Sequence, residues 1–256
     1  MKILCIGNSF SVDVSTYVHQ IAKAAGYDID IYGLYIGGCP IKEHWRLLNS
    51  KEPLYEFYIN GEKTPTMKCG IIDGLIYTKY DYITFQQVSS SSWDPNTYFP
   101  ELPLLMEGVR KYSDAKYLLH KTWSYAKNFH NEHYGSDPLD QAAMDKDVKN
   151  AYEVVSEKVG IKNIIPSGTC ISLARQKYGD ILNRDGFHLN ELGRTLTGIL
   201  WVMYLLGRTD LDLSNFVPSG YTYEYGVEGI SKEMIPELME IAKETLKENK
   251  GHNLED

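Results

Sequence analysis

The stretch KILCIGNSFS, residues 2–11, sets an apolar run of strand length directly against a small polar cluster. Apolar residues then recur at helical spacing from Val14 to Ala25, and Gly26 follows, a residue type that commonly ends helices. The sequence therefore predicts a strand and then a helix, with Ser9 at the junction. Ser9 could be a nucleophile or only a helix cap, because serine is a preferred residue at helix N-termini.

Much of the remaining chain repeats this order of strand and helix. Strands are expected at residues 28–36, 80–87, 115–123 and 161–168, and helices at about 102–112 and 142–159. Strands separated by helices are typical of a parallel sheet covered on both faces. We therefore expect a three-layer α/β/α sandwich with a parallel, flavodoxin-like five-stranded sheet.

One segment departs from this alternation. Residues 53–69 carry β-favouring side chains on both sides of Asn60-Gly61, a dipeptide suited to a two-residue turn, so a small inserted hairpin is expected there. From about residue 231 the chain has the pattern of a charged amphipathic helix. We interpret residues 1–256 as a single domain with a C-terminal helical extension at about residues 208–256.

Composition limits the classes of function. The net charge of -8 argues against a surface that follows nucleic-acid phosphates, so no nucleic-acid partner is expected. No apolar run has membrane-spanning length, and the first residues lack a secretory segment, which favours a cytoplasmic protein with no membrane partner. The four cysteines are widely spaced and form no zinc or disulfide motif: Cys5, Cys39, Cys69 and Cys170.

The polar residues that follow the predicted strands suggest the position of a site. In an open parallel sheet, ligands bind outside the carboxyl ends of the strands. Four polar strand ends are therefore expected to share one rim: Gly7-Asn8-Ser9, Gly37-Gly38, Gln86-Gln87 and Trp123-Ser124.

A serine nucleophile needs a base, normally a histidine held by a carboxylate. Of the seven histidines, only His188 has an acid three residues before it, Asp185, in the segment DGFHLN. Gly186 lets this short loop present both groups. The alternative is an exposed loop histidine beside an aspartate that caps a helix.

The segments IGNSFS, the Gly-rich turn and DGFHLNELG together resemble the SGNH (GDSL-like) hydrolases, in which the serine comes first and Asp-x-x-His last. The resemblance covers about residues 2–207. It implies that Ser9 is the nucleophile, His188 the general base and acid, and Asp185 the group that orients His188. It also implies that the backbone N–H groups of Ser9 and Gly38 form part of an oxyanion hole, and that no cofactor is needed.

Two departures from the family pattern point to particular branches. Asn8 stands where the family usually has aspartate, and FQQVS replaces the G-x-N-D block, which resembles DUF4886-type and carbohydrate-acetylesterase-like branches. Gln86 is the first polar residue at its strand end, and we expect its amide to complete the oxyanion hole. We expect Asn8, Gln87 and Trp123 to contact substrate, although tryptophan also commonly fills cores.

These features favour a serine esterase that hydrolyses small acyl esters, such as acetyl esters, through an acyl-enzyme. Carbohydrates are among the alcohols that such esters can contain. The alternative is a non-catalytic domain on the same fold that binds a small ligand or carbohydrate.

Two other candidate sites have weaker support in the sequence. The segment HNEH at residues 130–133 lacks the spacing of a helical metal motif, so no metal is expected. Cys39 could be a thiol nucleophile, but a lone cysteine usually has a buried apolar role. Residues 124–137 are expected to form a long loop over the site.

Overall fold

The computed structural model describes residues 1–65, 68–136, 138–217 and 230–249. Its centre is a seven-stranded sheet with the order β4-β3-β2-β1-β5-β6-β7. The strands, in chain order, are β1 (Lys2–Gly7), β2 (Asp30–Tyr35), β3 (Glu56–Ile59), β4 (Glu62–Lys63), β5 (Tyr82–Phe85), β6 (Lys116–His120) and β7 (Ile164–Ile165).

Five of these strands, β2, β1, β5, β6 and β7, are parallel and adjacent, in the flavodoxin-like order. The central strand β1 is almost wholly buried from Ile3 to Gly7, as expected for a strand covered on both faces. After β1 the chain forms β2 on one side of β1, and it later forms β5 on the other side. The strand order therefore reverses between β1 and β5. The carboxyl ends of β1 and β5 therefore flank the crevice where open α/β sheets bind ligands.

The predicted hairpin is confirmed as an antiparallel addition at the edge of the sheet. Strand β3 pairs with β2, and β4 pairs with β3. The turn residues Asn60 and Gly61 have φ values of 55° and 88°, which suit the two-residue turn that the sequence indicates. A Cβ atom on Gly61 would lie 2.2 Å from the carbonyl oxygen of Thr16, so the tip packs tightly against the main chain.

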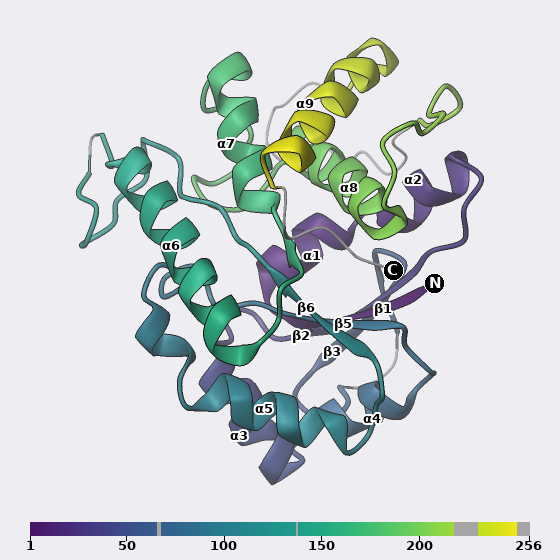
Figure 1. Cartoon of the computed structure of the whole chain (residues 1–256), viewed down its shortest axis with the longest axis vertical. Coiled ribbons are helices and arrows are strands. Elements are labelled where there is room, and N and C mark those ends of the chain that lie inside the picture. Colours follow the sequence, from purple (N-terminus) through teal and green to yellow (C-terminus); the bar gives the residue numbers. More distant parts are fainter. Residues whose placement is uncertain (66–67, 137, 218–229, 250–256) are drawn as a thin grey trace.

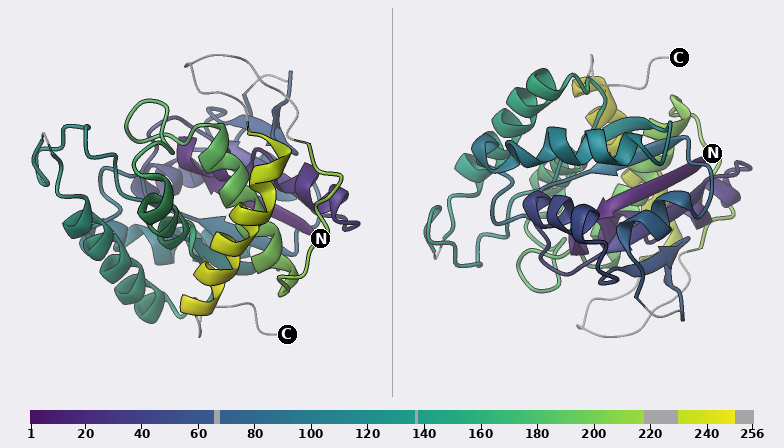
Figure 2. Two further views of the ribbon diagram at one scale, coloured as in Figure 1. Left: turned by 90° about the horizontal axis from the view of Figure 1, so that it is seen from above. Right: turned by 90° about the horizontal axis from the view of Figure 1, so that it is seen from below.

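Helices cover both faces of the sheet (Figures 1 and 2). One face carries α1 (Ser9–Ser15), α2 (Val18–Ala24), α7 (Ser167–Tyr178), α8 (Glu191–Leu206) and α9 (Ile235–Glu248). The other carries α3 (Ile41–Ser50), α4 (Ile71–Ile76) and α5 (Glu101–Arg110), while α6 (Gln141–Val159) contacts α7. Two short 3-10 helices complete the description, η1 (Pro95–Tyr98) and η2 (Lys232–Met234).

Helix α8 is the centre of its layer. It is buried along nearly its whole length because α1, α2, α7 and α9 all pack against it. Its N-cap is Asn190, whose side chain accepts a hydrogen bond from the Gly193 N–H at 3.2 Å. The start of the most buried helix is thus fixed only two residues after His188.

The three-layer α/β/α architecture is confirmed, but two predicted elements differ. The strand expected at residues 161–168 is only Ile164–Ile165, because α7 begins at Ser167. The expected helix from Val14 to Ala25 is two helices, α1 and α2, with a break between them. The Ser15 and Thr16 hydroxyls both donate hydrogen bonds to the carbonyl oxygen of Val12, at 3.2 and 2.8 Å. Such bonds compete with the helical backbone pattern, which explains why α1 ends there.

Candidate active site

At the junction between β1 and α1, the residue that caps the helix is not Ser9 but the one before it. Asn8 is the N-cap of α1, and its Oδ1 accepts a hydrogen bond from the Phe10 N–H at 3.2 Å. Ser9 is the first helical residue, so its hydroxyl is not needed as a cap. Its N–H has no acceptor within the helix and lies at the positive end of the helix dipole.

The structure brings Ser9, His188 and Asp185 together as a hydrogen-bonded set. The Nε2 atom of His188 lies 2.8 Å from Ser9 Oγ, and its Nδ1 atom lies 2.6 Å from Asp185 Oδ2. The two ring nitrogens therefore face a hydroxyl and a carboxylate on opposite sides. A proton on Nδ1 leaves Nε2 free to accept the serine proton, as general-base catalysis requires.

Asp185 supports both the imidazole and the loop that carries it. Its Oδ1 accepts hydrogen bonds from the backbone N–H groups of His188 at 2.8 Å and Phe187 at 3.3 Å. Partial burial works against ionisation of Asp185, but the hydrogen bonds from the His188 side chain and from these N–H groups outweigh it and lower the pKa. The carboxylate is thus stabilised in the charged form that orients His188.

The loop that carries His188 is held from outside by the segment 124–136. Gly186 has a φ of +90°, and its carbonyl accepts a hydrogen bond from the Ala126 N–H at 2.7 Å. A Cβ atom on Gly186 would lie 2.7 Å from the Phe129 ring. Only glycine fits this backbone conformation and close approach together. The expected long loop therefore lies against the candidate site.

Asp13 holds the same loop from the side of α1. It is 1% exposed, and its Oδ2 accepts a hydrogen bond from the Leu189 N–H at 2.8 Å. Its Oδ1 pairs with Arg184 at 3.0 Å and with Arg194 at 2.7 Å. Sequence reasoning missed this residue. The available signal was its spacing, because residues four apart on a helix share a face, and Ser9 already faces His188.

A buried polar chain lies beneath Ser9 at the ends of β1, β5 and β6. The Nε2 group of Gln86 donates to Asn8 Oδ1 at 2.7 Å, and Gln86 Oε1 lies 2.5 Å from His120 Nδ1. Burial lowers the pKa of His120 to about 3, so its ring is neutral and Nδ1 must carry the proton to donate to Gln86. Gln86 thus reaches Ser9 through the Asn8 cap. That it also donates directly to an oxyanion stays a prediction.

The turn that carries Gly38 lies beside the Ser9 junction. The Asn8 Nδ2 group donates to the Cys39 carbonyl at 3.1 Å, and the Ile36 N–H donates to the Gly7 carbonyl at 3.4 Å. Gly38 itself is exposed, with a φ of +62°. These bonds place its backbone next to Ser9, consistent with the oxyanion role that the resemblance implies and that stays a prediction.

Gln87 lies on the other side of the β5 end and braces two loops. Its Oε1 accepts from the Ile41 N–H at 3.0 Å, and its Nε2 donates to the Thr97 carbonyl at 2.7 Å. The side chain is 1% exposed. Its polar atoms are therefore committed to the backbone, which does not fit the expected contact with substrate. Asn8, also 1% exposed, is likewise committed to the contacts described above.

Trp123 lies under the His188 loop. It is fully buried, stacks on Phe10 with ring centroids 4.0 Å apart, and donates from its indole N–H to the Phe187 carbonyl at 2.7 Å. Strand β6 ends at His120, before Trp123, which lets the tryptophan turn inward. The expected substrate contact of Trp123 does not fit this burial. Its position makes it a support for the loop.

Two further candidates from the sequence are the Cys39 thiol and the histidines of residues 130–133. Cys39 is buried, and burial raises the pKa of its thiol to about 12, which disfavours the nucleophilic thiolate. Within the described ranges, no three His, Cys, Asp or Glu side chains are grouped as a metal site. His133 instead stacks on Trp93, with ring centroids 4.2 Å apart.

Among the described helices, none is long and apolar enough to cross a membrane.

Comparisons with known proteins identify the family and the fold. The family model of DUF4886, a domain of unknown function, matches residues 2–223. The crystal structure of a DUF4886 family protein from Bacteroides uniformis is 33% identical, with a TM-score of 0.82; the match covers 99% of this chain and 98% of that one. A search of curated proteins gave no match.

More distant structures share the fold. A candidate SGNH hydrolase from Slackia heliotrinireducens is 18% identical, with a TM-score of 0.55 over 80% of this chain and 98% of that one. A GDSL-like lipase candidate from Parabacteroides merdae is 13% identical, with a TM-score of 0.51 over 80% and 95% of the two chains. The expected resemblance to SGNH and GDSL-like hydrolases is confirmed at the level of the fold.

The contacts of Asp13 with the His188 loop lead to a first prediction. Asp13→Asn removes the charge that pairs with Arg184 and Arg194, so the His188 loop should shift and turnover of a small ester should fall about 10²-fold, with a smaller change in KM. Unfolding by urea should show a loss of stability as well, because two partly buried arginines lose the counter-charge of the buried Asp13. The exposed Asp114→Asn is the matched control, and unchanged kcat in Asp13→Asn would contradict the clamp.

The buried chain beneath Ser9 makes a second prediction. Gln86→Ala should lower kcat by about 10²-fold with little change in KM and with the circular dichroism spectrum intact, whereas Gln87→Ala should be mild in kcat. Asn8→Ala and the double variant Asn8→Ala/Gln86→Ala complete a cycle. If Gln86 acts through Asn8, the two losses will not add. Additive losses would instead indicate a direct oxyanion donor.

Proposed function

The chain belongs to the DUF4886 family, and we propose that it is a serine esterase of the SGNH type that removes small acyl groups, such as acetyl, from alcohols that include carbohydrates. The observation that carries this proposal is the pair of hydrogen bonds on His188, 2.8 Å to Ser9 Oγ and 2.6 Å to Asp185 Oδ2. The base is within hydrogen-bond reach of both the nucleophile and the orienting carboxylate, as the mechanism requires.

The first half of the reaction forms an acyl-enzyme. Ser9 Oγ attacks the ester carbonyl carbon while its proton moves to His188 Nε2, and the carbonyl oxygen becomes an oxyanion. As the tetrahedral intermediate collapses, the bond to the alcohol oxygen breaks and His188 gives that oxygen the proton. Asp185 stays ionised throughout and stabilises the transient imidazolium.

The second half repeats these steps with water. His188 Nε2 takes a proton from the attacking water, and the acyl–Oγ bond breaks as the proton returns to Ser9. The oxyanion forms twice near the start of α1, where the free Ser9 N–H and the helix dipole favour negative charge. The exposed Gly38 turn supplies the second donor in this proposal.

An aromatic pair on the same rim of the sheet supports a polar alcohol such as a sugar. The Trp93 and His133 pair lies partly exposed on the segments that follow β5 and β6, at the carboxyl-end rim of the sheet that also carries Ser9. Aromatic faces at the rim of a site suit sugar rings. No cofactor takes part in the proposed reaction.

A non-catalytic ligand-binding domain is the competing hypothesis. Asn8 in place of aspartate and the missing G-x-N-D block motivate it. Reaction with a fluorophosphonate probe separates the two functions, because only an activated serine is labelled quickly. Labelling of Ser9 supports the esterase, and an unlabelled Ser9 in folded protein supports the binding domain.

The triad makes a third prediction. Ser9→Ala and His188→Ala should each abolish hydrolysis of short-chain esters and fluorophosphonate labelling, while Asp185→Ala should leave a small residual activity, because the three residues act as a unit with distinct roles. Losses of several orders of magnitude in kcat are expected. The variant His130→Ala, which changes an exposed residue outside the triad, serves as the control. Wild-type turnover by Ser9→Ala would overturn the mechanism.

Acyl length makes a fourth prediction. Acetyl esters should have a higher kcat/KM than octanoyl esters, because the sequence has no extended apolar stretch suited to a tunnel for a fatty chain, and the rim is lined by loops. A series of p-nitrophenyl esters from two to eight carbons measures this preference. A kcat/KM that climbs steadily with chain length would point to a lipase-like pocket instead.

A further inference from the structure

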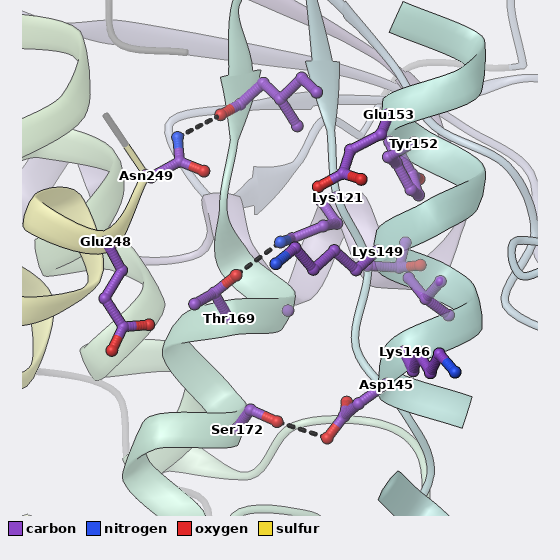
Figure 3. Close-up of a pocket in the computed structure, with 14 residues that line it drawn as sticks. Lys121, Asp145, Lys146, Lys149, Tyr152, Glu153, Thr169, Ser172, Glu248 and Asn249 are labelled. Atoms are coloured by element: carbon purple, nitrogen blue, oxygen red, sulfur yellow. Dashed lines mark hydrogen bonds between the residues drawn. The ribbon is translucent and has the colours of Figure 1, made fainter. Parts of the chain in front are cut away.

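A cavity of about 460 Å³ lies at the β7 edge of the sheet and shares no residue with the Ser9 triad. It is enclosed by α6, α7 and the end of α9 (Figure 3). Its floor is the chain just beyond β6. Lys121, 7% exposed, rises from this floor into the cavity.

The main chain fixes where Lys121 points. Its carbonyl accepts a hydrogen bond from the Gly168 N–H at 3.0 Å, and its own N–H donates to the Ile165 carbonyl at 3.0 Å. A Cβ atom on Gly168 would lie 2.0 Å from the Thr122 carbonyl oxygen, so the start of α7 is pressed against this segment. The ammonium of Lys121 is therefore held at the first turn of α7, where it donates to Thr169 Oγ1.

Among the described residues, Lys121 has no carboxylate as a direct partner. An ammonium has three N–H donors, and the partner of Lys121 is a neutral hydroxyl. Among the described residues, no carboxylate forms an ion pair with Lys121 or with Lys149. Lys149 projects from α6 toward the same point (Figure 3). Burial is the main cause that lowers the pKa of Lys121 to about 8, and the positive charge of Lys149 adds to it, while nearby carboxylates act in the opposite direction.

The walls around the two lysines carry three carboxylates and one further lysine, the exposed Lys146. Asp145 and Glu153 stand one turn before and after Lys149 on α6, and Glu248 faces them from the end of α9. These carboxylates lie close enough to raise the pKa of Lys121, but among the described residues none forms an ion pair with either lysine. A ligand here therefore meets positive charge at the bottom and hydrogen-bond acceptors at the rim. That distribution suits one compact negative charge and disfavours a multiply charged anion.

We propose that this cavity binds a small molecule through a single carboxylate group, held by Lys121, Lys149 and the Thr169 hydroxyl, with the ligand's hydroxyl or amino groups facing Asp145 and Glu248. The carboxylate supplies the direct ion pair that the buried ammonium does not make with the described side chains of the cavity. The N-terminal N–H groups of the twelve-residue helix α7 add a favourable field for the same charge. The site is separate from the proposed esterase reaction and does not depend on it.

The test follows the Lys121 side chain by NMR in the full chain labelled with ¹³C-lysine, during titration with acetate, glycine and inorganic phosphate. Acetate and glycine should shift the Lys121 signal in a saturable way and raise its pKa, because the bound anion favours the ammonium. Affinity should fall as the pH rises through about 8, where Lys121 loses its charge. Phosphate should bind at least tenfold more weakly because the rim is acidic.

Variants make the test specific. Lys121→Met should abolish carboxylate binding measured by calorimetry, and Lys149→Met, on the exposed wall, should weaken it about tenfold. Lys158→Met removes the same charge from α6 outside the cavity and should leave binding unchanged. Binding that survives Lys121→Met, tighter binding of phosphate, or a response that disappears in Ser9→Ala would each overturn the proposal, the last by placing the ligand at the triad.

Discussion

The hydrogen bond from the Asn8 side chain to the Phe10 N–H is the constraint from which the candidate site follows. Strand β1 passes into α1 with no intervening loop, so one residue must end the strand and cap the helix. Because Asn8 does this, the Ser9 hydroxyl is left for His188. Gln86 and His120 hold the cap from below, and this arrangement ties the Ser9 position to the ends of three neighbouring strands.

Helix α1 fixes both partners of the proposed reaction, although it has only seven residues. Its first residue is Ser9, and one turn later Asp13 binds the backbone next to His188. A buried carboxylate with two arginines adds little net stability, since desolvation offsets the attraction between the charges. The carboxylate instead fixes geometry, because the nucleophile and the loop that carries His188 are both held by the same short helix, α1.

Patterns in the sequence could predict what depends on chain order and local conformation. Strand and helix periodicity identified the five parallel strands, and Asn60-Gly61 identified the hairpin. The Asp185 and His188 spacing identified the pair that the structure places against Ser9. Contacts between distant segments could not be predicted in this way. Burial of Trp123 depends on where β6 ends, and the Gln87 contacts depend on α3 and η1, elements that no periodic signal had indicated.

The partners of Asn8 also bear on the choice between an esterase and a binding domain. Its departure from the family pattern was a reason to consider lost activity. In the structure, the amide accepts from Phe10 and Gln86 with its oxygen and donates to Cys39 with its nitrogen. A carboxylate could accept the first two bonds but could not donate the third, which joins the serine junction to the Gly38 turn. Asparagine thus links the two proposed oxyanion donors, so this departure is compatible with catalysis and is no evidence for its loss.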